Sequence, residues 1–397
     1  MSLEKTWRWF GKNDKIQLSD IRQIGIEGIV TALHHIQNGE IWSVEEINQV
    51  KIEIEQQGMR WSVVESLPVH EEIKYGGPNR DRLIENYKQS LVNLSKCGLD
   101  TICYNFMPVI DWIRTDLHYK LENGAEALFF DFVEFVVFDR YILGRQEAVK
   151  EYPEEIIEKA ARRNIEMTTK DKARLINTII VETQGFIDGI SVDNPVQAVK
   201  IFKELLKRYA GIGKVQLRQN LKFFLEAIIP DAEKYGIKMC IHPDDPPMKV
   251  LGLPRIVSSS DDIKWILGAI DSPANGLTFC SGSLSAGAHN NLNKMVHEFA
   301  HKIYFAHLRN THLLDNGNFY EAEHLQGRAD MYTILKALLH EQEKRSGNAR
   351  IPMRVDHGHR ILNDLLENHN PGYPLIGRMK AMAEIRGLEL GITRSIK

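Results

Sequence analysis

Four short segments in the second half of the chain carry side chains that could bind a metal ion. They read MCIHPDDPP, TFCSGS, YFAHLRN and MRVDHGH, and they contain His242, Cys280, His307 and Asp356. Imidazole nitrogen, thiolate sulfur and carboxylate oxygen together suit a borderline divalent ion such as Mn²⁺, Fe²⁺, Co²⁺ or Zn²⁺. Taken singly, such a histidine or cysteine is more often structural. Their common position at the ends of four successive predicted strands favours one shared ion.

The segment around Asp356 also offers a proton-transfer group. Asp356 and His357 are adjacent, and neighbouring side chains of a regular strand point to opposite faces. Both can face the site only if the backbone near Gly358 is irregular. We assign Asp356 to the metal ion and His357 to proton transfer.

Two proline-containing loops are predicted to hold further side chains at the same rim. The stretch HPDDPPM, residues 242–248, contains three prolines and is therefore stiff. Asp244 and Asp245 are expected to orient this loop or the His242 imidazole by hydrogen bonding. The tight PGYPLIGR segment presents Tyr373, whose phenol could act as an acid or a base. Packing is the alternative role for this tyrosine.

We also predict roles for three more residues on the strands. Arg309 has the parity of His307 and would lie one step above it, where its guanidinium could bind a substrate carboxylate with two hydrogen bonds; a surface ion pair is the alternative. Cys240 shares the face of His242 but lies two residues deeper, so we expect it in the core. Glu65 is expected to form an ion pair rather than to support the site.

Short strand-like runs alternate with helical runs along most of the chain, which predicts parallel strands joined by helices. No Gly-x-Gly-x-x-Gly turn or Walker lysine motif supports a doubly wound sheet. We predict a single α/β domain over residues 1–397, a (β/α)8 TIM barrel, with active-site residues at the C-terminal ends of its strands. The eight predicted strands are Thr6–Phe10, Gly28–Leu33, Arg60–Ser66, Thr101–Phe106, Lys238–His242, Gly276–Cys280, Ile303–Leu308 and Pro352–Asp356.

The regular alternation is interrupted between strands four and five. More than a hundred residues separate them, which predicts a long, mainly helical insertion at about 107–214. Its aromatic run LFFDFVEFVVFDRYILG is expected to pack against the barrel or another subunit. The best-defined barrel helix follows strand two, where Ser43 and Glu46 have capping-box spacing and Gly58 marks the end.

Composition excludes several classes of protein. The 397 residues include 43% hydrophobic and 26% charged residues and carry a formal net charge of −3, so a basic nucleic-acid-binding surface is not expected. Acidic and basic residues interrupt the apolar stretch Leu128–Leu143, which is too short to span a membrane. The N-terminus lacks the pattern of an export signal. The four cysteines show no disulfide framework, and we expect a cytoplasmic protein.

The segments CIHPDDPP, LTFCSGSL, FAHLRN and RVDHGH, together with MRWSVVESLPVHEEIK, closely resemble the mannonate dehydratase family of hexuronate degradation. The resemblance runs from end to end and implies a barrel similar to that of xylose isomerase. It implies conversion of D-mannonate to 2-keto-3-deoxy-D-gluconate and water, with one Mn²⁺ or Fe²⁺ ion, in a homo-oligomer that we expect to be a dimer. By resemblance, the metal ligands are His242, Cys280, His307 and Asp356, and the acid/base residues are His357 and Tyr373.

Three alternative functions remain at this point. A metal-dependent sugar isomerase or epimerase on the same barrel would release no water, but such sites are usually richer in carboxylates. A metal-dependent phosphodiesterase acting on damaged DNA is disfavoured by the acidic charge balance. A non-enzymatic metal-binding protein would have a closed ligand shell without neighbouring acid/base groups.

Overall fold

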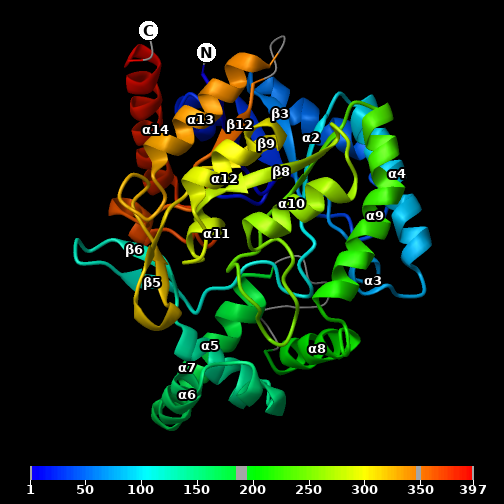
Figure 1. Ribbon diagram of the computed structural model, residues 1–397. Coiled ribbons are helices and arrows are strands. Elements are labelled where there is room, and N and C mark those ends of the chain that lie inside the picture. Colours follow the sequence, from blue (N-terminus) through cyan, green and yellow to red (C-terminus); the bar gives the residue numbers. More distant parts are fainter. Residues whose placement is uncertain (1, 185–194, 346–349, 396–397) are drawn as a thin grey trace.

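A closed barrel of eight parallel strands forms the centre of the computed structural model, which describes residues 2–184, 195–345 and 350–395 (Figure 1). Every predicted strand is present, and no end differs from its predicted position by more than two residues. The order around the barrel is β1-β12-β9-β8-β7-β4-β3-β2. The strands are β1 (Glu4–Arg8), β2 (Gly28–Thr31), β3 (Arg60–Glu65), β4 (Thr101–Tyr104), β7 (Lys238–Ile241), β8 (Asn275–Cys280), β9 (Ile303–His307) and β12 (Pro352–Arg354).

Helices follow each barrel strand and bury an apolar face against the outside of the barrel. Their bounds are α1 (Leu18–Gln23), α2 (Val44–Gln56), α3 (Glu71–Tyr75), α4 (Arg80–Lys96), α9 (Lys214–Lys234), α10 (Ser260–Ala269), α11 (Ser281–Ser285), α12 (Leu292–Phe299), α13 (Met331–Lys344) and α14 (Leu375–Ser395). Ser43 caps α2 as predicted, accepting a hydrogen bond from the Glu46 backbone at 3.1 Å, and Gly58 follows the helix with φ +71°. The Glu46 carboxylate contacts His35 instead of completing the predicted capping box.

The insertion between β4 and β7 is mainly helical, but it begins with a hairpin that the sequence did not reveal. Its aromatic run buries Phe130, Phe135 and Phe138 in a second apolar cluster beside the barrel core, and its helices gather at one end of the molecule (Figure 1). Residues 185–194 of the predicted insertion lie outside the described residues. The insertion contains β5 (Asp116–Lys120), β6 (Glu126–Phe130), α5 (Phe132–Val137), α6 (Glu154–Glu166), α7 (Thr169–Ile176) and α8 (Pro195–Arg208).

A small antiparallel sheet lies on the loops that follow the barrel strands. The order is β10-β11-β6-β5, and it joins the hairpin of the insertion to β10 (Thr311–Leu313) and β11 (Phe319–Glu321), which follow β9. Since both hairpins leave the C-terminal ends of barrel strands, the sheet covers the end where active sites of such barrels lie.

The barrel interior is filled by a short apolar layer. It consists of Val30, Val63, Cys103, Cys240 and Phe305, which confirms Cys240 as a core residue. Burial raises the pKa of the Cys240 thiol. Ionisable side chains lie beyond this layer, at the C-terminal ends of the strands. Within the described ranges, no helix is both long and apolar enough to cross a membrane.

Candidate metal centre and active site

The four predicted metal ligands come from the ends of four neighbouring strands. β12, β9, β8 and β7 are consecutive around the barrel, and parallel strands bring their C-terminal ends to one rim. Cys280 and His307 are the last residues of β8 and β9. His242 directly follows β7, and Asp356 lies two residues beyond β12.

The structure brings these four side chains together. The ligand atoms of His242, Cys280 and His307 all lie within 4.8 Å of one another. Nε2 of His242 is 3.2 Å from Nδ1 of His307. Oδ2 of Asp356 lies 3.8 Å from the sulfur of Cys280 and 3.9 Å from Nδ1 of His307. Such spacings allow nitrogen, sulfur and oxygen atoms to converge on one ion.

Hydrogen bonds orient both imidazoles for metal binding. Nδ1 of His242 lies 2.7 Å from the carbonyl oxygen of Pro243, so a hydrogen on Nδ1 leaves Nε2 facing the cluster. Nε2 of His307 lies 3.2 Å from Oε1 of Glu65 and 3.1 Å from Nε of Arg354, and its Nδ1 faces the cluster. Histidine ligands commonly donate their second N–H to a carbonyl or carboxylate in this way. The residues present therefore fit a divalent ion.

Hydrogen-bond donors surround the sulfur of Cys280. The backbone N–H of Ser283 donates to the sulfur at 3.4 Å, and the Ser283 hydroxyl donates at 3.1 Å. Cys280 is completely buried.

A left-handed backbone residue allows both Asp356 and His357 to reach the site. Asp356 has φ +60°, a conformation that residues other than glycine rarely adopt. The irregular backbone expected near Gly358 is therefore located at Asp356 itself. Strain of this kind is found where surrounding structure holds a functional side chain in place.

Arg354, which sequence reasoning did not select, links three ionisable groups at the rim. Its guanidinium donates to Oδ1 of Asp356 and, at 3.1 Å, to Oε1 of Glu65, while its Nε lies 3.1 Å from Nε2 of His307. Burial raises the pKa of Asp356, but the charges of Arg354 and its neighbours outweigh burial and hold that pKa well below its usual value. Glu65 forms the expected ion pair and also contacts a candidate ligand, so the two roles proposed for it are not exclusive.

Two arginines and two carboxylates form a buried ring beside the predicted metal ligands. Arg114 contacts Asp245 at 2.8 Å and Glu321 at 2.6 Å. Arg309 contacts the same two carboxylates at 2.6 Å and 2.9 Å. We call these four residues the arginine–carboxylate ring. Arg114 and Glu321 belong to the two hairpin-bearing loops, so the ring fixes those loops to the barrel rim.

The ring determines what Arg309 contacts. Its Nη2 also donates to the Ser283 hydroxyl at 3.0 Å, and its Nε lies 3.2 Å from Oδ2 of Asp356. Protein groups thus use both terminal nitrogens, and the assignment of Arg309 to a substrate carboxylate stays a prediction. Asp245 belongs to the ring and does not orient the His242 imidazole. Asp244 orients the loop, because its Oδ2 accepts from the Val257 backbone at 2.7 Å.

The two predicted proton-transfer residues lie next to each other and to the ligands. The rings of His357 and Tyr373 are 5.2 Å apart, and the Tyr373 hydroxyl donates to Oδ1 of Asp356 at 3.3 Å. Nδ1 of His357 lies 2.6 Å from Nη1 of Arg309 and 3.2 Å from Oε1 of Glu321. Burial lowers the pKa of His357 and raises that of Tyr373 to about 12.

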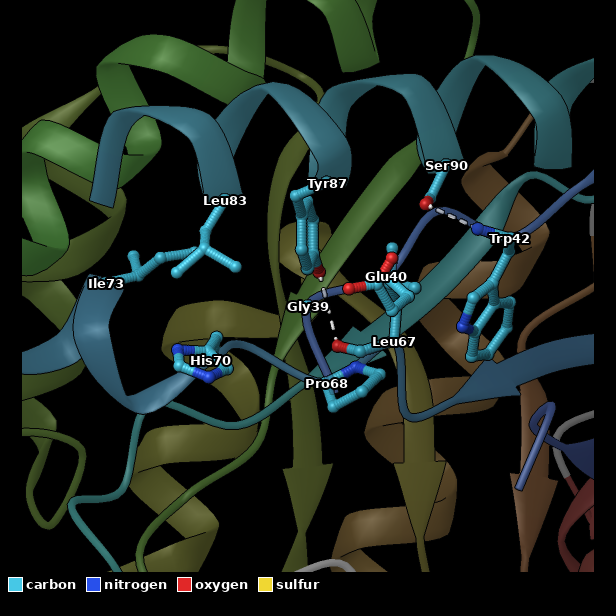
Figure 2. Close-up of a pocket in the computed structure, with 10 residues that line it drawn as sticks. All are labelled: Gly39, Glu40, Trp42, Leu67, Pro68, His70, Ile73, Leu83, Tyr87 and Ser90. Carbon is cyan, nitrogen blue, oxygen red and sulfur yellow. Dashed lines mark hydrogen bonds between the residues drawn. The ribbon is translucent and has the colours of Figure 1, made fainter. Parts of the chain in front are cut away.

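A separate small cavity lies on the outer side of the rim. Figure 2 shows it between α4 and the loops after β2 and β3, with Tyr87 donating to the carbonyl of Leu67 and the backbone N–H of Trp42 donating to Ser90. Its volume of about 10 Å³ accommodates about one water molecule. The cavity is therefore too small for a sugar acid.

The sequence matches the D-mannonate dehydratase (UxuA) family over residues 3–397. The chain belongs to this family. It is 51% identical over 400 residues to the mannonate dehydratase of Marinomonas sp. (strain MWYL1), covering 99% of this chain and 100% of that protein. It is 48% identical to the mannonate dehydratase of Chromohalobacter salexigens, covering 98% of this chain and 99% of that protein.

One solved structure agrees with this family assignment, and another shares the barrel fold. The crystal structure of mannonate dehydratase from Streptococcus suis serotype2 has a TM-score of 0.78 and 32% identity, covering all of this chain and 96% of that chain. A D-allulose 3-epimerase from Methylomonas sp. has a TM-score of 0.50 and 11% identity, covering 98% of this chain and all of that chain. The similarity to the epimerase shows the fold alone. That fold is the barrel that the sequence predicts.

Proposed function

We propose that this protein is a dehydratase that converts D-mannonate to 2-keto-3-deoxy-D-gluconate and water. The observation that supports it is the convergence of His242, Cys280, His307 and Asp356 beside two proton-transfer candidates. Family membership and about 50% identity to two mannonate dehydratases identify the sugar acid.

The reaction removes a proton from C2 and hydroxide from C3. When bound, a divalent ion supplies positive charge that stabilises the negative charge developing on the substrate oxygens. His357 and Tyr373 provide the base that takes the C2 proton and the acid that protonates the leaving C3 hydroxyl. The ring carboxylate Glu321 and Arg309 hold the His357 imidazole in place through its Nδ1.

Isotope exchange distinguishes the two proton-transfer roles. In D2O, a variant that lacks only the acid still exchanges the C2 hydrogen of D-mannonate, whereas a variant that lacks the base does not. The His357→Asn and Tyr373→Phe variants, each loaded with metal, are therefore expected to give opposite results. Exchange in both variants would show that neither His357 nor Tyr373 is the base.

We propose Mn²⁺ or Fe²⁺ as the ion, because the set of two imidazoles, one thiolate and one carboxylate combines softer and harder donors. We also propose a cytoplasmic homodimer. The four cysteines are free, in keeping with a reducing compartment, and sedimentation of the metal-loaded protein would measure the oligomeric state.

The decisive experiment is an assay with a panel of aldonates. Metal-loaded protein is incubated with D-mannonate and its epimers, and 2-keto-3-deoxy products are quantified. We expect product from D-mannonate and loss of activity after chelation. Formation of an isomer or epimer without loss of water would contradict the proposal, and so would full activity after exhaustive chelation.

A further inference from the structure

Arg8 is the last residue of β1 and lies at the rim of the barrel, next to the strand that carries Asp356. β1 pairs with β12 on one side and β2 on the other. Trp7 is buried in the core between the barrel and the helices, so alternation directs Thr6 and Arg8 to the barrel interior. Arg8 is therefore the uppermost inward-facing residue of β1.

The groups around the Arg8 guanidinium belong to the active site. Its side chain is 11% exposed, and its Nη1 lies 3.8 Å from Oε2 of Glu65. The guanidinium lies over the Phe10 ring, 4.9 Å from its centroid, and that ring contacts Tyr373 edge-on at 4.9 Å. Arg354 and Tyr373 are among the ionisable groups that act on Arg8.

Arg8 differs from Arg309 and Arg354 in the hydrogen bonding of its terminal nitrogens. Arg309 and Arg354 direct their terminal nitrogens to carboxylates at hydrogen-bond distance. Among the residues that the structure describes, Nη1 of Arg8 is buried and has no hydrogen-bond partner. Its nearest carboxylate, Glu65, is already shared with Arg354 and His307.

A buried guanidinium with an unused donor is costly unless an anion completes its hydrogen bonds. Burial also lowers the pKa of Arg8. The planar fork of arginine matches a carboxylate, which can accept two parallel hydrogen bonds. A sugar acid bound beside the four ligands would bring one carboxylate into this region.

We propose that Arg8 binds the carboxylate of the sugar-acid substrate. This inference rests on the proposed dehydratase function and assigns to Arg8 the role that the sequence suggested for Arg309. The ring holds Arg309 in place, whereas Arg8 retains the hydrogen-bonding capacity to recognise substrate charge.

The test compares Arg8→Gln and Arg8→Lys with the wild type in the manganese-loaded, full-length protein. Arg8→Gln should raise the KM for D-mannonate roughly 10- to 100-fold, as expected for loss of hydrogen bonds to a charged group, with a much smaller effect on kcat. Arg8→Lys keeps the charge but not the fork, so its KM should be intermediate. Arg82→Gln, at an exposed position of α4, is the matched control and should leave KM unchanged.

Two readouts independent of turnover complete the test. In a Tyr373→Phe background, calorimetry should show the same loss of D-mannonate affinity on adding Arg8→Gln. The neutral analogue D-mannonamide should inhibit the wild type and Arg8→Gln equally, because it has no carboxylate. Metal content and the thermal midpoint establish that both variants are folded and loaded.

The outcomes distinguish failure of the Arg8 assignment from failure of the proposed function. If the wild type dehydrates D-mannonate but Arg8→Gln leaves KM and calorimetric affinity unchanged, the assignment of Arg8 is wrong. Equal weakening of D-mannonate and D-mannonamide would also overturn it, because the effect would not depend on the carboxylate. If the wild type neither binds nor dehydrates D-mannonate, the proposed function itself fails.

Discussion

Gly282 and Arg309 approach so closely that a Cβ atom on Gly282 would lie 1.9 Å from Nε of Arg309. The arginine cannot move aside easily, because Asp245 and Glu321 hold its two terminal nitrogens. Gly282 thus leaves the space through which Arg309 reaches the arginine–carboxylate ring and His357.

Gly282→Ala is therefore expected to displace Arg309 and to lower both kcat and the thermal midpoint. Gly268→Ala is the matched control, because Gly268 lies in α10 and a Cβ there would have no neighbour within 4 Å. That control should be neutral or slightly stabilising. Equal behaviour of the two variants in activity and thermal unfolding would contradict the close-approach argument.

The second prediction concerns Glu65, whose Oε1 lies 3.2 Å from Nε2 of His307. Glu65→Gln weakens the orientation of that imidazole and removes a countercharge of Arg354. We expect the affinity for Mn²⁺ to fall about 10- to 100-fold, as is typical when a partner behind a metal ligand is lost. A titration of metal-free protein measures it. An unchanged dissociation constant would show that Glu65 serves only as an ion-pair partner.

Substitution of Cys280 tests the ligand set directly. Cys280→Ser should reduce metal content and activity and should abolish any loss of activity that the wild type shows in air, since the sulfur is the oxidisable donor. Elemental analysis and assays under air and nitrogen measure these effects. Full metal content together with full activity in this variant would mean that Cys280 is not a ligand.

Loss of Arg114 tests the stabilising role of the ring. Arg114 is completely buried and contacts Asp245 and Glu321. Arg114→Met leaves buried negative charge with less compensation, which typically destabilises a protein by about 3–5 kcal/mol. Chemical unfolding of metal-free protein measures the change. The surface variant Arg82→Met should differ from the wild type by less than about 0.5 kcal/mol, and a comparably small effect of Arg114→Met would contradict the prediction.

The lowered pKa of Glu321 predicts how the stability of the metal-free protein changes with pH. Burial raises the pKa of Glu321, but Arg309 and Arg114 outweigh burial and lower that pKa from 4.5 to about 2. A carboxylate with a lowered pKa stabilises the folded state above its unfolded value and loses this contribution as pH falls through its folded value. The stabilisation is therefore present above pH 4.5 and is lost as the pH falls towards 2.

Thermal midpoints at several pH values between 5 and 3 test this response. Glu321→Gln should be less stable than the wild type at pH 5, and the difference should shrink as the pH falls. The wild type and Glu321→Gln share all the other buried carboxylates, so the difference between their thermal midpoints reports on Glu321. A difference that stays constant with pH would show that Glu321 does not titrate in this way.

The barrel and the clustering of the four candidate ligands were predictable because their signals are local. Each strand is a short apolar run next to a helical pattern, and the rim position of His307 follows from where its strand ends. β1 begins and ends two residues earlier than predicted, and because side chains alternate with a period of two, the same residues still face inward. An irregular backbone was expected near Gly358, and the structure has a left-handed residue at Asp356.

The small sheet and the arginine–carboxylate ring could not be predicted in this way. β10 and β11 are three residues long, and β11 pairs with β6, nearly two hundred positions earlier in the chain. Arg114 and Glu321 are likewise 207 positions apart, so no local pattern joins them. Arg354 could have been predicted from strand alternation, because it is the last residue of β12 and lies two residues before Asp356.

The order of the barrel strands also sets when the site can form during synthesis. β7, β8, β9 and β12 all belong to the second half of the chain, and β12 closes the barrel by pairing with β1. Domains generally fold as units while the chain emerges with its N-terminus first. β1 is thus made well before β12, and Arg8 comes to the same rim as Asp356 only when β12 pairs with β1. The four predicted metal ligands can therefore come together only after most of the barrel has been synthesised.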